Sequence, residues 1–437
     1  MKLLALLCLA LAVPVAAEAR LTSAEQRMIE TVDSEQERSI ALLERLVNQN
    51  SGSLNLAGVE EVGRMMRAEL EPLGFEVRWA PMAEAGRSGH IVATHKGYGR
   101  GKKMLLIGHL DTVFEPDSPF QTFTRKSPTE AEGPGIGDDK GGMVVMVAAL
   151  RAMQAAGTLK AADIEIVLTG DEEDNGLPIE IARGDLVAAG RRADVALDFE
   201  GLSQQDGRDM GAIARRSSGG WELRTTGRTG HSSGIFSTNS GNGAIYELSR
   251  ILAAFRSELP EPNLTFNVGL IAGGTTATLD ADKIRATATG KTNIIPEIAI
   301  ARGDIRTLSL EQDRRVRAKM LEIASRHLPG TSAELRFDPD TYPPMAPTEG
   351  NKALLAKLNI VNRDMGLPQM EAIDPLRRGA GDIGFVAADV DGLVGLGPAG
   401  ERSHAPGETV DLPSIARQAK RAAILMSRLA KERPARQ

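Results

Sequence analysis

Histidine and acidic side chains occur at five places where an apolar run ends or a helical stretch begins. They lie in residues 108–111, 137–142 and 171–173, and at Glu200 and His404. In an open α/β sheet, ligands bind outside the carboxyl ends of the strands. We therefore expect these five segments to meet at one edge of a sheet.

The residue types in these segments are metal ligands. Two histidines and several carboxylates, without cysteine, suit divalent ions of hard to borderline character such as zinc, with cobalt or manganese as alternatives. Two such ions carry four positive charges, which three carboxylates and a hydroxide would cancel. One carboxylate must bridge the ions, because two-metal sites hold them roughly 3.5–4 Å apart. The pattern predicts a two-metal centre.

Two further carboxylates have expected supporting roles. In an extended segment residues two apart face the same side, so Asp111 can accept the second ring N–H of His109 and fix its tautomer. The adjacent residues Glu172 and Glu173 permit a division of labour. One carboxylate binds metal while the other takes a proton from the attacking water.

Taken singly, each motif has a simpler interpretation. An isolated H-x-D is often structural, an acidic triplet such as 171–173 is often a solvated loop, and Glu200 alone would be a strand-end charge. The glycine-rich residues 133–142 could cradle a phosphate. However, they lack the G-K-[ST] ending of a P-loop, and Lys140 stands where G-x-G-x-x-G requires glycine. Their joint occurrence, in order, favours the metal centre.

The elements around these residues indicate the fold. Residues 23–77 are typical of helices, and 143–156 form another helical stretch. Buried strands are expected from four apolar runs, at 104–110, 164–169, 195–199 and 393–396. Strands that alternate with helices predict a mostly parallel sheet, in an α/β domain with both faces covered.

A second region has a different pattern. More alternating, strand-like runs lie at 221–228, 265–271, 283–290 and 298–307, with helical patterns at 243–257 and 310–327. They predict a small α+β domain of ferredoxin-like type. A chain of 437 residues exceeds the roughly 250–300 residues at which single cores stop growing. We therefore predict an α/β domain from residues 20–212 and 341–437, with residues 213–340 inserted.

The first residues have the pattern of a secretory signal peptide. Lys2 precedes an apolar run over residues 3–15, and Ala17-Glu18-Ala19 forms an A-x-A cleavage site. The run is too short to span a membrane, so we expect residues 1–19 to be removed and the protein to be secreted or periplasmic without a membrane anchor. An uncleaved N-terminal helix is the alternative. Cys8, the only cysteine, lies in this leader, so the mature chain would have neither a disulfide nor a thiol nucleophile.

The composition argues against nucleic acid as a partner. The formal net charge is -6, and aromatic residues make up 3% of the chain. Binding to phosphates normally requires a basic face, and no basic stripe is visible.

The motifs resemble those of the M20 family of metallopeptidases, in particular its glutamate-carboxypeptidase-like branch, over nearly the whole mature chain. Residues 108–113, 133–142, 171–173 and 403–406 resemble its metal and D-E-E motifs. The resemblance implies Glu172 as general base and two zinc ions per chain. It places one ion between His109, Asp138 and Glu200, and the other between Asp138, Glu173 and His404. Gly201 follows Glu200 where proline is common, which leaves Asp198 as an alternative ligand.

The inserted region also resembles the lid and dimerisation domain of that family, with residues 227–232 matching a histidine segment. The resemblance implies a homodimer in which His231 reaches the partner's site. His231 and Asn293 would stabilise an oxyanion, and Arg306 would clamp a substrate carboxylate. An exposed loop histidine and an ordinary ion pair are the simpler interpretations.

Other positions depart from the family or match none of its motifs. Ile235 stands where proline is frequent, and Gly381 stands where serine or threonine is usual. The three histidines outside the motifs are expected on the surface: His90, His95 and His327.

The expected activity is two-zinc hydrolysis of an amide bond next to a free carboxylate, in a small peptide, as in a carboxypeptidase or dipeptidase. An N-acyl-amino-acid deacylase would use the same site. A catalytically silent binding or dimerisation module is a more distant alternative, and it predicts a damaged site. Spacing does not specify the substrate side chain.

Overall fold

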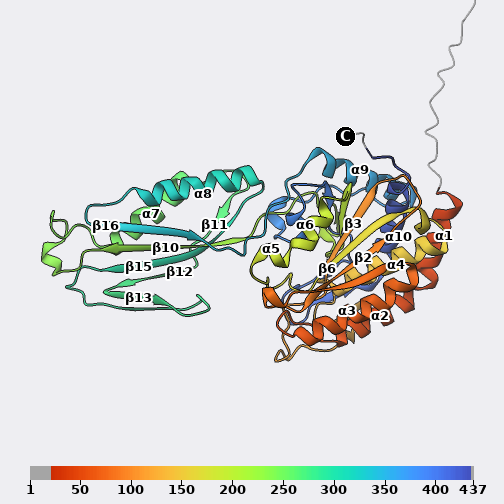
Figure 1. The fold of residues 1–437 in the computed structure, drawn as a ribbon, viewed down its shortest axis with the longest axis horizontal. Helices are drawn as coiled ribbons and strands as arrows, with labels where there is room; N and C mark the ends of the chain where they lie inside the picture. Colours follow the sequence, from red (N-terminus) through yellow and green to blue (C-terminus); the bar gives the residue numbers. More distant parts are fainter. Residues whose placement is uncertain (1–20, 435–437) are drawn as a thin grey trace, which may run out of the picture.

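The computed structural model describes residues 21–434, so the expected signal peptide at residues 1–19 lies outside the described residues. Figure 1 shows a large body of mixed α/β structure and a smaller arm that extends from one side of it. Within residues 21–434, no helix combines the length and apolar character that crossing a bilayer requires.

The large body is built on a six-stranded sheet in the order β1-β2-β6-β3-β7-β17. Its strands, in chain order, are Glu76–Pro81, Gly89–His95, Lys103–His109, Asp163–Thr169, Val195–Asp198 and Gly392–Leu393. The strands β6, β3, β7 and β17 are parallel, while β1 and β2 form an antiparallel edge. The predicted mostly parallel sheet is confirmed.

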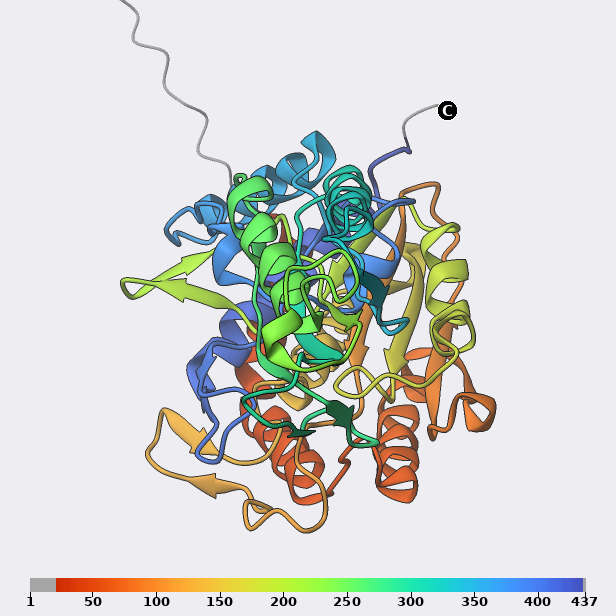
Figure 2. The same cartoon turned by 90° about the vertical axis from the view of Figure 1, so that its left-hand side faces the viewer.

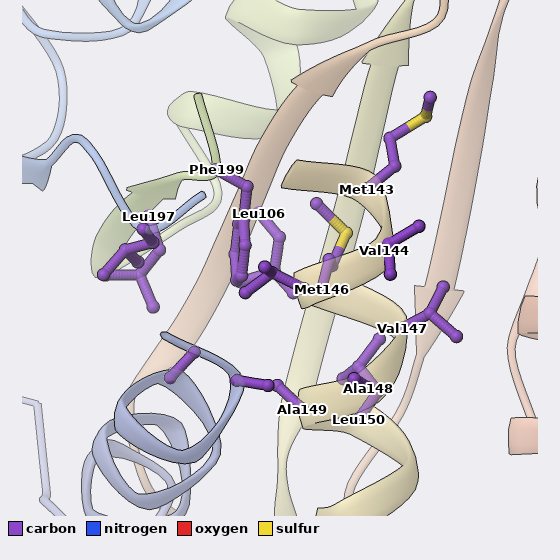
Figure 3. Close-up of a cluster of buried hydrophobic side chains, with 14 of the residues drawn as sticks. Leu106, Met143, Val144, Met146, Val147, Ala148, Ala149, Leu150, Leu197 and Phe199 are labelled. Atoms are coloured by element: carbon purple, nitrogen blue, oxygen red, sulfur yellow. The ribbon is translucent and has the colours of Figure 1, made fainter. Parts of the chain in front are cut away.

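Helices cover both faces of this sheet because its central strands are apolar on both sides. Along β3, Leu106 packs into the cluster that contains α4, while Leu105 packs into the cluster of the opposite face. Figure 3 shows Met146 of α4 beside Leu106 of β3. Almost every side chain of α4 is buried. Because the helix is packed on all sides, it holds the end of the preceding loop in one position.

The helices of the large body lie on either side of the sheet. They are α1 (Ser23–Ser34), α2 (Gln36–Asn48), α3 (Leu56–Leu70), α4 (Lys140–Ala155), α5 (Ile179–Ala182), α6 (Gly184–Gly190), α9 (Glu349–Asp364) and α10 (Leu412–Leu429). Two small sheets complete the body. They are formed by β4 (Thr124–Arg125), β5 (Glu130–Glu132), β18 (Gly400–Glu401) and β19 (Thr409–Asp411), and by β8 (Ser203–Gln205) and β9 (Arg208–Met210). In Figure 2 the hairpins β4–β5 and β8–β9 project from the same side of the body.

The arm has the α+β architecture that the sequence predicts. Its main sheet has the order β11-β15-β10-β16, with β12 also paired to β15, and α7 and α8 lie along one face of it (Figure 1). The elements are β10 (Gly219–Gly227), α7 (Ala244–Glu258), β11 (Thr265–Phe266), β12 (Leu270–Gly274), β13 (Thr276–Leu279), β14 (Ala286–Thr289), β15 (Ile298–Arg306), α8 (Leu310–Ser325) and β16 (Thr331–Phe337). Trp221 of β10 and Phe255 of α7 meet edge to face in a separate core.

The chain enters and leaves the arm through two adjacent segments. Antiparallel bridges join Arg215 to Met345 and Ser218 to Tyr342. We call residues 215–218 and 342–345 the crossing segments.

One histidine expected on the surface is buried. His90 has no exposed surface, because it lies in β2 within the sheet. Its Nε2 bonds to the carbonyl of Ala182 at 2.8 Å, and its Nδ1 accepts from the backbone N–H of Gly170 at 3.0 Å. Two backbone partners satisfy the ring, so the prediction for His90 was wrong. His327 is exposed, as expected, and His95 is half-buried.

The first helix is anchored to the last one by a buried carboxylate. Thr22 and Glu25 form a capping box at the start of α1, and Glu25 accepts a hydrogen bond from Arg428 of α10 at 2.8 Å. Burial alone would raise the pKa of Glu25. The bonds from Arg428 and Thr22 outweigh it and hold the pKa below the usual 4.5.

We expect Glu25→Gln to lower the free energy of unfolding by about 1 kcal/mol at pH 7. A carboxyl whose pKa falls on folding stabilises the fold above its unfolded pKa and loses that contribution as the pH falls through the folded value. The difference from wild type should therefore shrink below about pH 4.5. Urea unfolding across pH 3–7, with the exposed Glu30→Gln as control, measures it. An equal loss at every pH would contradict the assignment.

Candidate metal centre

A cleft of about 410 Å³ lies at the carboxyl ends of the central strands. It is lined by side chains from segments far apart in the sequence, among them Asp138, Glu172, Glu200 and His404. His109 ends β3, Glu172 follows β6, and Glu200 follows β7. The expected meeting of these segments at one edge of the sheet is therefore present.

Asp138 lies between two histidines. Its Oδ1 is 3.0 Å from Nε2 of His109, and its Oδ2 is 3.1 Å from Nε2 of His404. The same His404 nitrogen is 3.2 Å from Oε2 of Glu173. Each oxygen of Asp138 thus faces a different histidine, which is the arrangement that a bridging carboxylate needs.

Asp111 supports this group from behind. Its two carboxylate oxygens accept the backbone N–H groups of Glu172 and Glu173, each at 3.0 Å. Nδ1 of His109 bonds to the backbone carbonyl of Asp111 at 3.1 Å, and the Asp111 carboxylate lies 3.4 Å away. The expected contact between this pair is present, with the backbone oxygen as the nearer acceptor. Asp111 also fixes the D-E-E loop, which the sequence had not suggested.

A buried arginine holds the other side of the D-E-E loop. Arg183 is 2% exposed and pairs with Asp171 at 2.5 Å and with Asp382 at 2.7 Å. Tyr342, on a crossing segment, donates its hydroxyl hydrogen to the backbone carbonyl of Glu172. Neither residue was singled out from the sequence, because an isolated arginine or tyrosine matches no metal or catalytic pattern.

A third residue that the sequence analysis missed, Glu408, shapes the loop that carries Asp138. The carboxylate of Glu408 accepts three backbone N–H groups, from Gly135 at 2.9 Å, Gly137 at 2.8 Å and Asp138 at 3.0 Å. Burial raises the pKa of Glu408 to about 7. Its position four residues after His404 was the only signal available in the sequence.

Glu200 faces the cleft, but its partner is an arginine, whereas Asp138 and Glu173 contact histidines. Its carboxylate pairs with Arg215, and Arg378 lies 3.8 Å away. Asp198, the alternative ligand, is fully buried and accepts the backbone N–H of Glu200 at 2.9 Å. The potential ligand atoms that gather within 4.8 Å of one another, among the described residues, come from His109, Asp138 and Glu173.

Two of the expected site residues lie elsewhere in the arm. The lining of the cleft in the described chain includes Arg306, but neither His231 nor Asn293. His231 is exposed, and its Nδ1 bonds to the hydroxyl of Ser233 at 2.8 Å. The loop after β10 lies at the end of the arm remote from the large body (Figure 1). A nine-residue strand such as β10 is about 30 Å long, so His231 is far from the cleft of its own chain.

The residues present fit divalent metal ions. Histidine nitrogens and carboxylate oxygens converge, and Oε1 of Glu173 is buried without a hydrogen-bond partner. Burial, with the nearby charge of Asp138, raises the pKa of Glu173 to about 7. Asp138 and Glu173 raise the pKa of His404 to about 11. Carboxylates as close together as Asp138 and Glu173 require compensating positive charge, which metal ions would supply.

We expect Glu408→Gln to weaken the metal centre and the fold together. The glutamine amide would direct N–H groups at backbone N–H groups, leaving buried donors unsatisfied, at a cost of about 1–3 kcal/mol. Zinc affinity should fall because the loop that carries Asp138 loses its support. Urea unfolding and zinc titration of the purified variant measure both effects.

The matched control is Glu401→Gln, an exposed glutamate on the neighbouring strand β18. It should leave stability and zinc affinity at wild-type values. If Glu408→Gln behaves like this control, the supporting role of Glu408 is wrong.

Comparison with known proteins agrees with this geometry. The model of peptidase family M20/M25/M40 matches residues 105–428. Carboxypeptidase G2 of Pseudomonas sp. (strain RS-16) is 28% identical over 280 residues, which are 64% of this chain and 62% of that protein. This chain thus covers less than two thirds of that relative's length. Succinyl-diaminopimelate desuccinylase of Novosphingobium aromaticivorans is 28% identical over 299 residues, 66% of this chain and 73% of that protein.

A solved structure shares the fold. The YXEP protein of Bacillus subtilis, described as a dinuclear metal-binding peptidase of the M20 family, superposes with a TM-score of 0.63 at 17% identity. The superposition covers 91% of this chain and 99% of that one. The family model spans most of the chain, including every residue of the metal group and the whole arm. This chain therefore belongs to peptidase family M20/M25/M40, a family of metal-dependent hydrolases.

Proposed function

We propose that this protein is a two-zinc hydrolase that cleaves an amide bond next to a free carboxylate in a small peptide. The observation that carries the proposal is Asp138, whose two oxygens face His109 and His404. Because a carboxylate in that position can bridge two ions, it supports a two-metal rather than a one-metal centre. Cobalt or manganese would also suit the ligand types.

In this proposal, His109, Asp138 and Glu200 would hold one ion, and Asp138, Glu173 and His404 would hold the other. Glu200 is preferred to Asp198 because Glu200 lines the cleft, whereas Asp198 is fully buried. To bind metal, Glu200 would have to turn away from Arg215, with which it pairs in this structure. When bound, the ions would polarise the scissile carbonyl and make the attacking water more acidic.

Glu172 is the proposed general base. It lines the cleft, and burial raises the pKa of its carboxyl well above the usual value, which suits a group that must both take and return a proton. The backbone N–H of Glu172 donates to Asp111, and its backbone carbonyl accepts from Tyr342. These two bonds fix the position of the backbone from which the Glu172 side chain extends. Glu172 takes the proton of the attacking water and passes it to the leaving amine.

Arg306 is proposed to bind the free carboxylate of the substrate. It lines the cleft at the near end of β15, and Asp304 orients its guanidinium with an Nε contact of 3.2 Å. A planar guanidinium can bind a carboxylate through two parallel hydrogen bonds. The second candidate function is N-acyl-amino-acid hydrolysis, supported by the desuccinylase among the relatives. A silent module would show a damaged site, but all five proposed ligands and the base are present.

We further propose that the mature protein is a secreted or periplasmic homodimer in which His231 serves the partner's site, where His231 and Asn293 stabilise an oxyanion. The distance of His231 from its own cleft supports this arrangement. Aromatic side chains near it are also exposed, Phe236 by 61% and Tyr246 by 52%. Exposed apolar clusters of this kind mark interaction surfaces.

The variant Glu172→Gln should retain zinc and lose activity by about 10²- to 10⁴-fold, because a neutral amide cannot take the proton. Removal of zinc with a chelator should abolish activity of the wild type, and added zinc should restore it. Metal analysis and hydrolysis of dipeptides and N-acetyl amino acids measure both effects. Glu180→Gln, on the exposed side of α5, is the control. Full activity in Glu172→Gln would disprove the assignment.

Mixing two inactive variants tests whether His231 acts across the dimer. Glu172→Gln and His231→Ala homodimers should each be defective at both sites. A mixed dimer has one complete site if His231 comes from the partner, so random exchange should restore about a quarter of wild-type activity. Kinetics and sedimentation after subunit exchange measure this. An inactive mixture that contains mixed dimers would place His231 in its own chain's site.

A further inference from the structure

Three arginines line the cleft, and they differ in how well they are paired. Arg306 contacts Asp304, and Arg215 pairs with Glu200 while donating to the backbone carbonyls of Gly379 and Ala380. Arg378 has no such set. Its nearest carboxylate oxygen, on Glu200, is 3.8 Å away, and its Nε is buried without a hydrogen-bond partner in the described chain.

Hydrogen bonds to the neighbouring backbone fix the position of Arg378. It follows a short 3-10 turn, Pro375–Arg377, whose first backbone N–H group is capped by Asp374 at 2.9 Å. Arg215 donates to the next residue, Gly379, at 2.9 Å. The side chain of Arg378 is only 17% exposed. The backbone is therefore held by hydrogen bonds both before and after Arg378, and Arg378 lines the wall of the cleft.

Arg378 has no carboxylate within hydrogen-bonding distance in the described chain. The two guanidinium groups of Arg215 and Arg378 share one carboxylate, that of Glu200. A side chain at position 381 would meet Glu200 at 2.5 Å, so Gly381 leaves the room that the Arg215–Glu200 pair occupies. If Glu200 turns to a metal ion, both arginines lose that partner. A guanidinium in the cleft wall whose N–H groups lack close partners can donate them to an anionic ligand.

We propose that Arg378 binds a second carboxylate of the substrate, and that the preferred substrates are therefore dianions with one carboxylate at Arg306 and another at Arg378. This inference rests on the proposed hydrolase function and names its substrate class. A cleft of about 410 Å³ is within the usual range for small-molecule ligands. The second carboxylate belongs either to an acidic acyl group or to the acidic side chain of the released amino acid.

Two matched pairs of substrates distinguish these sources. N-succinyl-alanine and N-succinamoyl-alanine differ only by a carboxylate on the acyl side. N-acetyl-glutamate and N-acetyl-glutamine differ only by one on the amino-acid side. In one pair, the zinc-loaded wild type should favour the charged member by roughly 10- to 100-fold in kcat/KM, as expected for a charge-assisted hydrogen bond.

Arg378→Gln should lower that ratio towards one, and Arg378→Lys should keep part of it, because lysine retains the charge but not the planar fork. Arg377→Gln is the matched control, since Arg377 is the exposed neighbour on the same turn. Zinc content and circular dichroism of each variant establish that the metal centre and fold are retained.

Binding without turnover separates this inference from the proposed function. Calorimetry of the zinc-loaded protein compares succinate with succinamate, and glutamate with glutamine. A preference for the charged member that Arg378→Gln removes would support the site, even if none of the four substrates were hydrolysed and the proposed function failed. Hydrolysis with a charge preference that Arg378→Gln leaves unchanged, or no preference in either pair, would overturn the role of Arg378.

Discussion

The carboxylate of Asp138 is the point on which the arrangement of the site depends. It contacts histidines that are separated by almost 300 residues, one at the end of a central strand and one in a late loop. Glu408 fixes its position by accepting hydrogen bonds from three backbone N–H groups of the loop that carries it. The helix α4, whose side chains are nearly all buried, follows directly after that loop. A partly buried anion in such surroundings is stable only when charged or hydrogen-bonding partners surround it. The rigid sheet and helix below provide that geometry.

The two crossing segments connect the arm to the cleft. Arg215 lies on one segment and pairs with Glu200, while Tyr342 lies on the other and holds the carbonyl of Glu172. Arg306, at the near end of the arm, lines the same cleft. A change in the orientation of the arm would therefore act on a proposed ligand, on the proposed base and on the proposed substrate clamp together. Through these contacts the arm takes part in shaping the site.

The sequence predicted the strands and helices well where a strong apolar pattern existed. The runs at 104–110, 164–169 and 195–199 became central strands because parallel strands are buried on both faces. Patterns were less informative for single polar residues. His90 was placed on the surface, but it is satisfied inside the sheet by two backbone partners from distant segments. Arg183 and Glu408 were missed for the same reason, since their partners are backbone groups and carboxylates that only the folded chain brings near.

By itself, the sequence determined the fold class, the family and the residues proposed to bind metal, because residue type and order along the strands carry that information. The tertiary structure decided how these residues are paired. It placed Glu200 against Arg215, left Arg378 without a close partner, and put His231 at the far end of a strand about 30 Å long. These outcomes depend on distances and charge balance between segments that are remote in sequence. Spacing along the chain contains no such distances, so only the packed structure could supply them.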